Sequence, residues 1–304
     1  MRSLVIMACC LLLNGTVTSQ VVTTQQAAAS ATQYVEIDGN KIGYRTIGSG
    51  RPLILLTRLR GTLDTWDPLF LDHLAQTHRV ITLDYPGTGY SSGTLPTDLG
   101  QLAAFVKAFT TKIGVTRFAV LGWSWGGIVS QAVMLRYPEA ISHAVLVGTA
   151  PPGPERAEIQ QVWLERALKP INDLDDEEIL FFEPKSESSR RAAKMSRDRI
   201  YARPDVVSKI PSKPSEFQAF FNVADAFRVD TLGLRGQLAK SSVPILILCG
   251  DNDPSVPATN WYPLIGQIPR AQLLVLPQSG HGPQHQYPEL SAKYIVAFLQ
   301  NVGD

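Results

Sequence analysis

The chain has 304 residues, which is enough for one large α/β domain or for a core domain that carries an insertion. Hydrophobic residues make up 44% and charged residues 18%, an ordinary balance for a soluble globular protein. A formal net charge of +1 excludes the strong one-signed field that recruits nucleic acid or anionic membrane surfaces. We therefore expect no nucleic-acid partner, and a small, largely neutral substrate suits this charge balance.

The N-terminus has the layout of a secretory signal peptide. Arg2 supplies a short positive region, an almost unbroken apolar run covers residues 4–13, and small and polar residues follow. The apolar run is too short to span a bilayer permanently. We predict a signal peptide over residues 1–19, export to the periplasm or the exterior, and no stable membrane span after cleavage. An uncleaved anchor and a misassigned start are the alternatives, and Cys9 with Cys10 adds a less favoured lipoprotein signal.

Residues 20–32 carry no hydrophobic period and are predicted to form a flexible leader. Two of the three cysteines fall in the predicted signal peptide, so Cys249 would be alone in the mature chain. No intramolecular disulfide is expected in that chain. Because Cys249 sits in an apolar run, we predict that it is a small buried hydrophobe.

From residue 33 onward, short apolar runs alternate with amphipathic stretches. Turn residues between residues 34–37 and 41–47 predict a hairpin. Continuous apolar runs predict buried strands at residues 53–57, 80–83, 118–121, 143–147, 245–249 and 273–276. Apolar residues every three to four positions predict helices at residues 99–113, 127–137 and 288–300. This alternation predicts an α/β fold with a mostly parallel central sheet flanked by helices.

Residues 151–242 interrupt the alternation. This stretch opens with prolines and a glycine, and it holds helix-like patches but no good buried strand. Asp175 with Glu178 fits a capping box at the start of one helix. We predict a helical cap over the carboxyl edge of the sheet, where open α/β sheets bind ligands. The core then comes in two parts, residues 33–150 and residues 243–304.

The pentapeptide Gly-Trp-Ser-Trp-Gly at residues 122–126 follows one predicted strand and precedes a predicted helix. In that context a sharp turn lifts the serine hydroxyl clear of the sheet, and the helix N-terminus favours a developing oxyanion. We predict Ser124 as a nucleophile, with a purely structural turn as the alternative. Trp123 and Trp125 flank it and are predicted to line an apolar pocket, although core packing explains one of them equally well.

A serine needs a positioned base, and the chain has five histidines. His281 lies between two glycines just after the strand predicted at residues 273–276, where it can reach the same sheet edge as Ser124. We predict His281 as the base, with His285 as the runner-up. The remaining three are predicted to be surface or packed residues: His73, His78 and His143.

The histidine in turn needs a carboxylate to orient it. Asp251 and Asp253 both follow the strand predicted at residues 245–249, and the residues alone leave both open. The order serine, acid, histidine is that of the α/β-hydrolases and not of the chymotrypsin or subtilisin folds.

These motifs resemble the α/β-hydrolase superfamily, in its esterase, lactonase and haloperoxidase-like branch, over residues 34–300 apart from the cap. Residues 84–91 are similar to its D-x-x-G-x-G-x-S segment, and residues 250–257 match its G-x-x-D-x-x-x-P acid loop. In that loop the acid is the third residue after the glycine. The resemblance therefore implies Asp253 as the catalytic acid and Asp251 as a turn residue.

One segment departs from the family pattern. The His-Gly pair that commonly follows the third strand is replaced here by Thr57 and Arg58. The resemblance places the oxyanion hole at the backbone N–H groups of Leu59 and Trp125, which the replacement does not remove. Arg58 and Arg60 are candidates for binding a substrate carboxylate at the mouth of the site, whereas a solvated or ion-paired arginine is the favoured alternative.

The predicted function is hydrolysis of a small, largely apolar carboxylic ester or lactone through an acyl-enzyme. A serine at the nucleophile position argues against the dehalogenase and epoxide-hydrolase chemistry that similar enzymes perform with an aspartate. The sequence contains no HExxH metal motif and no phosphate-cradling glycine loop, so neither cofactor nor metal is expected. The alternatives are hydrolysis of a carbon–carbon bond or an amide by the same residues, and a ligand receptor on the same fold.

Overall fold

The computed structural model describes residues 26–155 and 157–301. The predicted signal peptide and residues 20–25 of the predicted leader lie outside the described residues.

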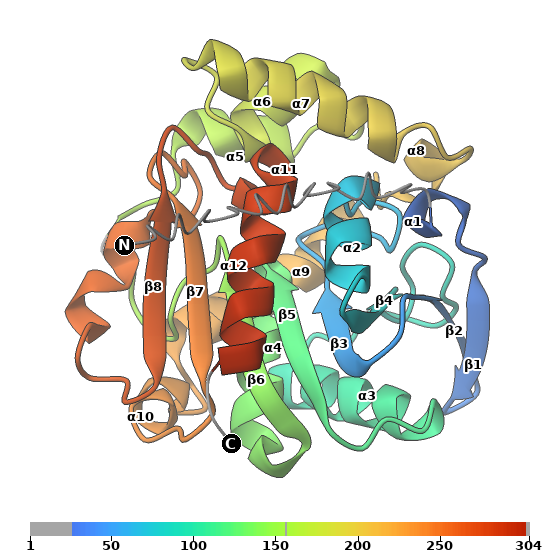
Figure 1. Ribbon diagram of the computed structural model, residues 1–304, viewed down its shortest axis with the longest axis vertical. Helices are drawn as coiled ribbons and strands as arrows, with labels where there is room; N and C mark the ends of the chain where they lie inside the picture. Colours follow the sequence, from blue (N-terminus) through green and yellow to red (C-terminus); the bar gives the residue numbers. More distant parts are fainter. Residues whose placement is uncertain (1–25, 156, 302–304) are drawn as a thin grey trace, which may run out of the picture.

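An eight-stranded sheet forms the centre of the molecule, in the order β1-β2-β4-β3-β5-β6-β7-β8 (Figure 1). The β1–β2 and β2–β4 pairs are antiparallel and the other five pairs are parallel. Every predicted strand is present with ends within two residues of the prediction, which confirms the mostly parallel sheet. The strands are β1 (Gln33–Ile37), β2 (Asn40–Ile47), β3 (Arg51–Leu56), β4 (His78–Leu83), β5 (Phe118–Trp123), β6 (Ile141–Val147), β7 (Ile245–Gly250) and β8 (Ala271–Leu276).

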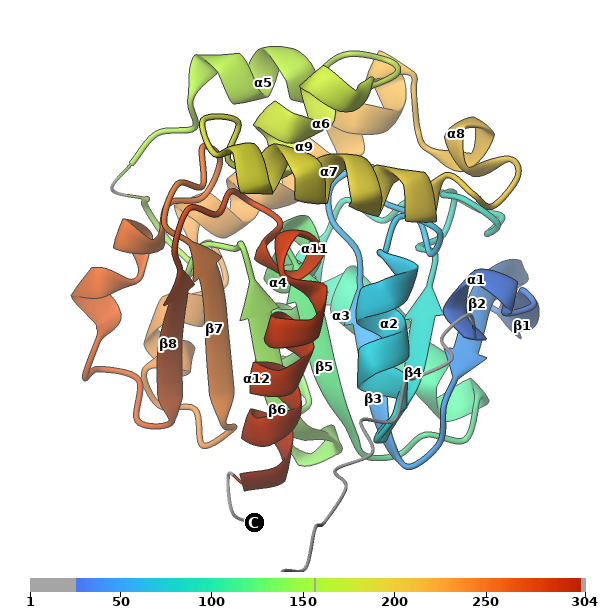
Figure 2. The ribbon, with the colours of Figure 1, turned by 45° about the horizontal axis from the view of Figure 1, so that its top comes forward.

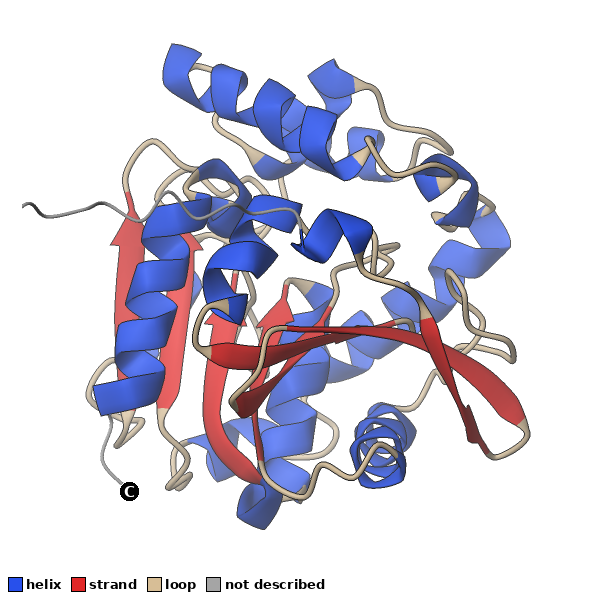
Figure 3. Ribbon diagram, turned by 45° about the vertical axis from the view of Figure 1, so that its right-hand side comes forward, coloured by secondary structure: helices blue, strands red, loops and turns tan. Residues whose placement is uncertain are grey.

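Helices cover both faces of this sheet (Figure 3), and each face buries its own apolar layer. Successive strand residues point to opposite sides, so Ile54 and Leu56 of β3 join one layer while Leu53 and Leu55 join the other. The first layer includes α3 and α4, and the second includes α2 and α12. The helices of the core are α2 (Pro68–Ala75), α3 (Leu99–Lys112), α4 (Trp125–Arg136), α11 (Pro283–Gln286) and α12 (Pro288–Asn301), with 3₁₀ turns at Pro138–Ala140, Ala258–Asn260 and Tyr262–Leu264.

The strand order opens a crevice at the carboxyl ends of β3 and β5. The chain passes from β3 to β4 on one side and then crosses to β5 on the other side of β3. Loops that leave neighbouring strands in opposite directions make the ligand crevice of open α/β sheets. Residues 57–61 follow β3 and Ser124 follows β5, so the sheet brings the predicted oxyanion loop to the predicted nucleophile.

Helices are the only regular elements among the described residues between β6 and β7. Figure 2 shows α5 to α8 lying across the carboxyl ends of the strands, as expected of a cap. The last two helices behave differently, because α9 and α10 bury side chains in the core layer that contains α3 and α4. The six helices are α5 (Gln161–Ala167), α6 (Leu174–Phe181), α7 (Glu187–Ile200), α8 (Val206–Lys209), α9 (Pro214–Val229) and α10 (Leu234–Leu238).

The predicted capping box in the cap is wrong by two residues. Helix α6 begins at Leu174, so the capping residue is Asp173 rather than Asp175. Its carboxylate accepts the Asp176 N–H at 2.9 Å, and the Asp176 carboxylate accepts the Asp173 N–H at 3.2 Å. A run of acidic residues offers several equivalent boxes, and the packing of the helix selects one.

The described end of the predicted leader is docked rather than flexible. Helix α1 (Gln26–Ala29) buries Ala27, whose N–H donates to Asp72 Oδ1 at 2.9 Å. Arg203, which follows α7, donates to the carbonyls of Ala28 at 2.6 Å and Ser30 at 2.9 Å. Orphan carbonyls at a helix end thus find a cationic donor from the cap. The sequence pattern of the leader has no apolar period that signals this contact.

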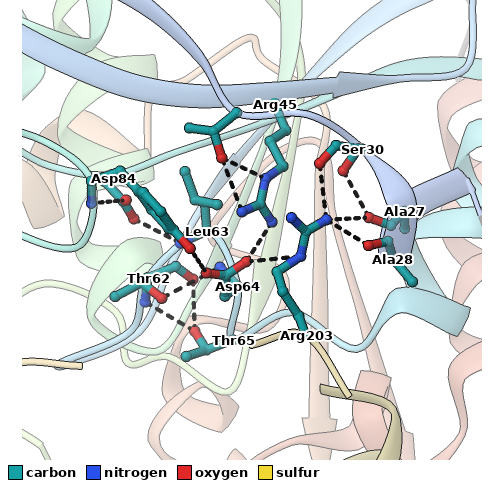
Figure 4. Close-up of polar contacts among 12 residues, drawn as sticks. Ala27, Ala28, Ser30, Arg45, Thr62, Leu63, Asp64, Thr65, Asp84 and Arg203 are labelled. Atoms are coloured by element: carbon teal, nitrogen blue, oxygen red, sulfur yellow. Dashed lines mark hydrogen bonds and ion pairs between the residues drawn. The ribbon is translucent and has the colours of Figure 1, made fainter. Parts of the chain in front are cut away.

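A buried carboxylate joins the core, the cap and α1 (Figure 4). The side chain of Asp64 is fully buried, accepts hydrogen bonds from Arg45 and from the Tyr90 hydroxyl, and lies 3.4 Å from Arg203. Two arginines from distant parts of the chain therefore share one counter-charge.

Replacement of Asp64 by alanine is expected to lower the free energy of unfolding by about 3 kcal/mol, because it leaves buried guanidinium groups without their partner. Urea denaturation measures this loss. The matched control is Asp198→Ala on α7, whose pair with Lys194 is more than half exposed and is worth under about 1 kcal/mol. Equal losses in the two variants would contradict the role given to Asp64.

The D-x-x-G-x-G-x-S segment has a structural explanation. The Asp84 carboxylate accepts the N–H groups of Leu63 and Tyr90, each at 2.7 Å, and so ties the loop after β4 to the loop after β3. Gly89 has a φ of +54°, and a Cβ there would lie 2.2 Å from Asp84 Oδ2. Burial raises the pKa of Asp84 to about 7.

Candidate active site

The turn at Ser124 holds a strained backbone. Ser124 lies between β5 and α4 with φ 56° and ψ −119°, a region that non-glycine residues rarely adopt. Its N–H donates to Val147 O at 2.8 Å, and its carbonyl accepts the Gly127 N–H at 2.8 Å. Bonds on both sides of the residue fix the turn and present the hydroxyl at the sheet edge.

The two glycines of the pentapeptide are required by close backbone approach. A Cβ on Gly122 would lie 2.2 Å from Gly126 O, and a Cβ on Gly126 would lie 2.0 Å from Leu56 O. Strand β5, helix α4 and the end of β3 therefore meet more closely than any side chain allows. Helix α4 begins at Trp125, two residues earlier than predicted, so its N-terminus lies directly beside Ser124.

His281 lies within hydrogen-bond distance of both other members of the predicted catalytic set. Its Nε2 is 2.8 Å from Ser124 Oγ and its Nδ1 is 2.7 Å from Asp253 Oδ2. The imidazole is almost fully buried. Trp123 donates its indole N–H to His281 O at 2.9 Å, and Phe181 of the cap accepts the Gly282 N–H at 2.7 Å. Core and cap thus both hold the histidine loop.

The two candidate acids occupy different environments. The Asp253 side chain is fully buried, and its Oδ1 accepts the N–H groups of Ser255 and Val256, each at 2.8 Å, which leaves Oδ2 facing His281. Asp251 is exposed, and its Oδ1 accepts the Ser279 N–H at 3.0 Å. The structure therefore brings Asp253 to the histidine and places Asp251 in a turn that supports the histidine loop.

The predicted oxyanion donors lie around Ser124. Leu59 and Trp125 both line the cavity that contains Ser124. The loop after β3 is closed by a bond from the Gly61 N–H to Arg58 O at 2.9 Å, and Arg60 takes a φ of 59°. The oxyanion role of these two N–H groups stays a prediction.

A cavity of about 250 Å³ opens at Ser124. Apolar side chains from the core and from α5 and α9 make most of its wall. One region is charged, where Glu155 and Arg228 form an ion pair at 3.5 Å and burial raises the pKa of Glu155. The lining consists of Leu59, Ser124, Trp125, Ile128, Thr149, Ala150, Glu155, Ile159, Trp163, Leu164, Phe220, Phe221, Ala224, Asp225, Phe227, Arg228, Ser255 and Val256.

Arg60 borders a small hollow beside Ser124, but its donors are bonded to the protein, which favours the predicted alternative of a paired arginine over binding of a substrate carboxylate. Its guanidinium is buried over the Phe217 ring, 4.3 Å from the centroid. It donates to four backbone carbonyls of the segments around the cap helices, at distances from 2.6 to 2.8 Å. These carbonyls, which belong to Ala167, Lys169, Pro170 and Pro211, use its donors and fix the cap on the core.

Trp123 also differs from its prediction as a pocket residue. It is fully buried on the face of the sheet away from the cavity, and it contacts His285 at 4.5 Å between ring centroids. Trp123 ends β5 and packs in the layer of α2 and α12, whereas Trp125 begins α4 and packs in the layer of α3 and α4. Trp125 packs its ring on Phe220 at 4.9 Å.

The runner-up histidine has a structural role. His285 is buried, its Nε2 accepts the Asp67 N–H at 3.2 Å, and burial lowers its pKa to about 3. A neutral, fully packed imidazole is not placed to take a proton from Ser124. His78 is also buried, and Cys249 is fully buried, which confirms the prediction for that cysteine.

Sequence reasoning missed three residues of the site. Trp163 of α5 lines the cavity with its ring centroid 5.8 Å from that of His281, and Glu155 and Arg228 form the charged region. These residues come from the cap and from the loop before it, which contain no motif. Only the folded arrangement shows which of the cap aromatics meet the nucleophile.

The described residues hold neither a metal-binding cluster nor a membrane-spanning helix. Residues 26–155 and 157–301 contain no group of three or more histidine, cysteine, aspartate or glutamate side chains arranged to hold a metal ion. Within the same ranges, no helix has the length and apolarity needed to cross a bilayer.

Comparison with known proteins gives consistent relatives. Residues 51–288 match the family described as alpha/beta hydrolase fold. A pimeloyl-[acyl-carrier protein] methyl ester esterase of Nitrosomonas europaea is 26% identical over 262 residues, which cover 82% of this chain and 95% of that protein.

Solved structures show the same similarity. An alpha/beta hydrolase fold protein from Chitinophaga pinensis is 30% identical with a TM-score of 0.79, over 90% of this chain and 99% of that one. The enol-lactonase from Burkholderia xenovorans shares the fold with a TM-score of 0.68 at 22% identity, over 88% of this chain and 100% of that one.

Proposed function

We propose that this chain, which belongs to the α/β-hydrolase family, is a serine hydrolase that acts on ester bonds and cleaves a small, largely apolar carboxylic ester or lactone. One observation carries the proposal. Asp253, His281 and Ser124 form a hydrogen-bonded line with spacings of 2.7 and 2.8 Å, and the serine end of the line opens into an apolar cavity.

The geometry supports a two-step mechanism. Ser124 Oγ attacks the carbonyl carbon while His281 Nε2 takes its proton, and Asp253 stabilises the imidazolium through Nδ1–H. The N–H groups of Leu59 and Trp125 hold the oxyanion of the tetrahedral intermediate. His281 then protonates the departing alcohol, which leaves an acyl group on Ser124. A water molecule that gives its proton to His281 releases the acid and restores the serine.

The cavity supports the proposed substrate class. Its volume of about 250 Å³ is near the lower end of small-molecule sites, and its wall is mostly apolar. An apolar group of a few carbons fills such a space and leaves the scissile carbonyl at Ser124. In a lactone the departing alcohol stays tethered to the acyl group, and the same steps apply.

We expect a fluorophosphonate probe to label the wild type and to leave Ser124→Ala unlabelled, because only an activated serine attacks the phosphorus. An ester and lactone panel should then show multiple turnover. Labelling of fractionated host cells with the same probe also tests the proposed export, which places the active protein in the periplasmic or external fraction.

The other outcomes of the labelling and turnover experiments would each support a different function. Absence of labelling of the folded wild type would contradict the serine mechanism. Labelling with turnover of amides or β-diketones, but not of esters or lactones, would assign the same residues to the alternative hydrolases. Labelling without multiple turnover on any substrate would favour a ligand receptor.

A further inference from the structure

A second, smaller hollow lies beside the candidate nucleophile. It has a volume of about 20 Å³ and is bounded by the loop after β3, by α6 and by the histidine loop. Ser124, His281 and Arg58 all line it. Arg58 also lines an adjoining hollow of about 30 Å³, together with Glu177 and Tyr201. The guanidinium thus lies beside the nucleophile in a different hollow from the one that Glu155 lines.

Arg58 keeps unused hydrogen-bond donors. Its NH1 donates to Leu59 O at 2.8 Å, but its buried Nε has no hydrogen-bond partner among the described residues. Within the same part of the chain no carboxylate lies within ion-pair distance of it. Its guanidinium carbon lies 4.4 Å from the centroid of the Phe181 ring and 5.3 Å from that of Trp123, so aromatic faces fix its position.

The nearest negative charge is already shared. Glu177 accepts a hydrogen bond from the Tyr201 hydroxyl at 2.6 Å and forms an ion pair with Arg197. It attracts Arg58 without touching it, and burial lowers the pKa of Arg58. Arg60 next to it adds further positive charge. The region between the nucleophile and α6 therefore holds more arginine than carboxylate.

On the premise of the serine-hydrolase function proposed above, we propose that Arg58 forms an anion subsite, so that the preferred substrates are esters or lactones carrying an ionised carboxylate close to the scissile carbonyl. A guanidinium presents planar paired donors that match a carboxylate, and partial burial strengthens such a contact. Half-esters of short dicarboxylic acids fit this description. Their alkyl group occupies the apolar cavity while the carboxylate displaces water beside Arg58, whose side chain has room to adjust in the adjoining hollow.

Arg58 and Arg60 differ in how many of their hydrogen-bond donors the protein already uses. Four cap carbonyls take up the donors of Arg60, whereas Arg58 has a single backbone acceptor. Both arginines line the hollow, but Arg58 keeps most of its donors for a ligand whereas Arg60 uses four of its five.

The test compares two esters that differ in charge but hardly in shape: monobutyl glutarate and the butyl ester of glutaramic acid. We expect wild-type kcat/KM to favour the anionic ester by about 10- to 100-fold, the range of a charge-assisted hydrogen bond. Arg58→Gln should bring the ratio of the two values close to one, and Arg58→Lys should keep part of it. The matched control is Arg191→Gln on the exposed face of α7, which should leave the ratio unchanged.

Binding without turnover gives an independent measurement. Glutarate should slow fluorophosphonate labelling of the wild type, have a smaller effect on labelling of Arg58→Lys, and have a much weaker effect on labelling of Arg58→Gln. If the wild type hydrolyses the neutral ester as well as the anionic one, the anion subsite is wrong and the proposed function stands. If the preference survives in folded Arg58→Gln, another residue supplies it. If neither ester is hydrolysed and the probe does not label Ser124, both proposals fall.

Discussion

Replacement of His281 by alanine is expected to lower kcat on the best ester or lactone roughly a million-fold. The loss is large because His281 Nε2, 2.8 Å from Ser124 Oγ, is placed to take the proton that the hydroxyl must lose on attack. Without it the serine is a weak nucleophile in a buried site that admits few other bases. Steady-state kinetics at saturating substrate measures the loss, and thermal unfolding establishes that the variant is folded.

The double variant Ser124→Ala, His281→Ala sharpens the same expectation. Residues that act as one unit are not additive, so the double variant should lose hardly more than either single variant. His73→Ala is the matched control, because His73 lies on α2 outside the cavity and should leave kcat unchanged. Losses that multiply in the double variant would show that Ser124 and His281 act separately, and the proposed mechanism would fail.

The fold was predictable from the sequence because its signals are local and strong. Continuous apolar runs such as residues 245–249 are strands buried on both faces, and their ends agree with the structure within two residues. The insertion before β7 was also visible, since it lacks such runs. The residue at which its helix α6 begins was not predictable, because the acidic run around Asp176 offers several equivalent helix starts.

The placement of the candidate site was also predictable, although its residues are far apart in the sequence. They lie at strand ends, and parallel strands bring their ends to one edge of the sheet. The roles of Trp123 and Arg60 were not, because each depends on contacts with the cap. Arg60 meets four carbonyls from residues more than 100 positions away along the chain. No local pattern signals such contacts, and α1 docks through long-range bonds of the same kind.

Asp253→Asn is expected to lower kcat by about 10⁴-fold, and Asp251→Asn by no more than a few-fold. In the wild type, His281 Nδ1 lies 2.7 Å from a carboxylate oxygen of Asp253. Asparagine keeps the shape of that side chain but presents either an amide N–H or an uncharged oxygen to the histidine. The imidazole then loses the partner that selects its tautomer and stabilises its charged form in the transition state. At Asp251 the bonded group is the Ser279 N–H, and an asparagine oxygen accepts that bond nearly as well.

The pair of variants separates catalysis from loop support, because both acids lie in one turn and only one contacts the histidine. Steady-state kcat for each, with thermal unfolding as the measure of folding, gives the comparison. A collapse of turnover in Asp251→Asn with retention in Asp253→Asn would assign the acid to the other residue. If both collapse while both remain folded, the turn that positions Ser279 matters as much as the carboxylate itself. In that case the bond from Asp251 to the histidine loop, rather than the buried charge alone, would set the placement of His281 over Ser124.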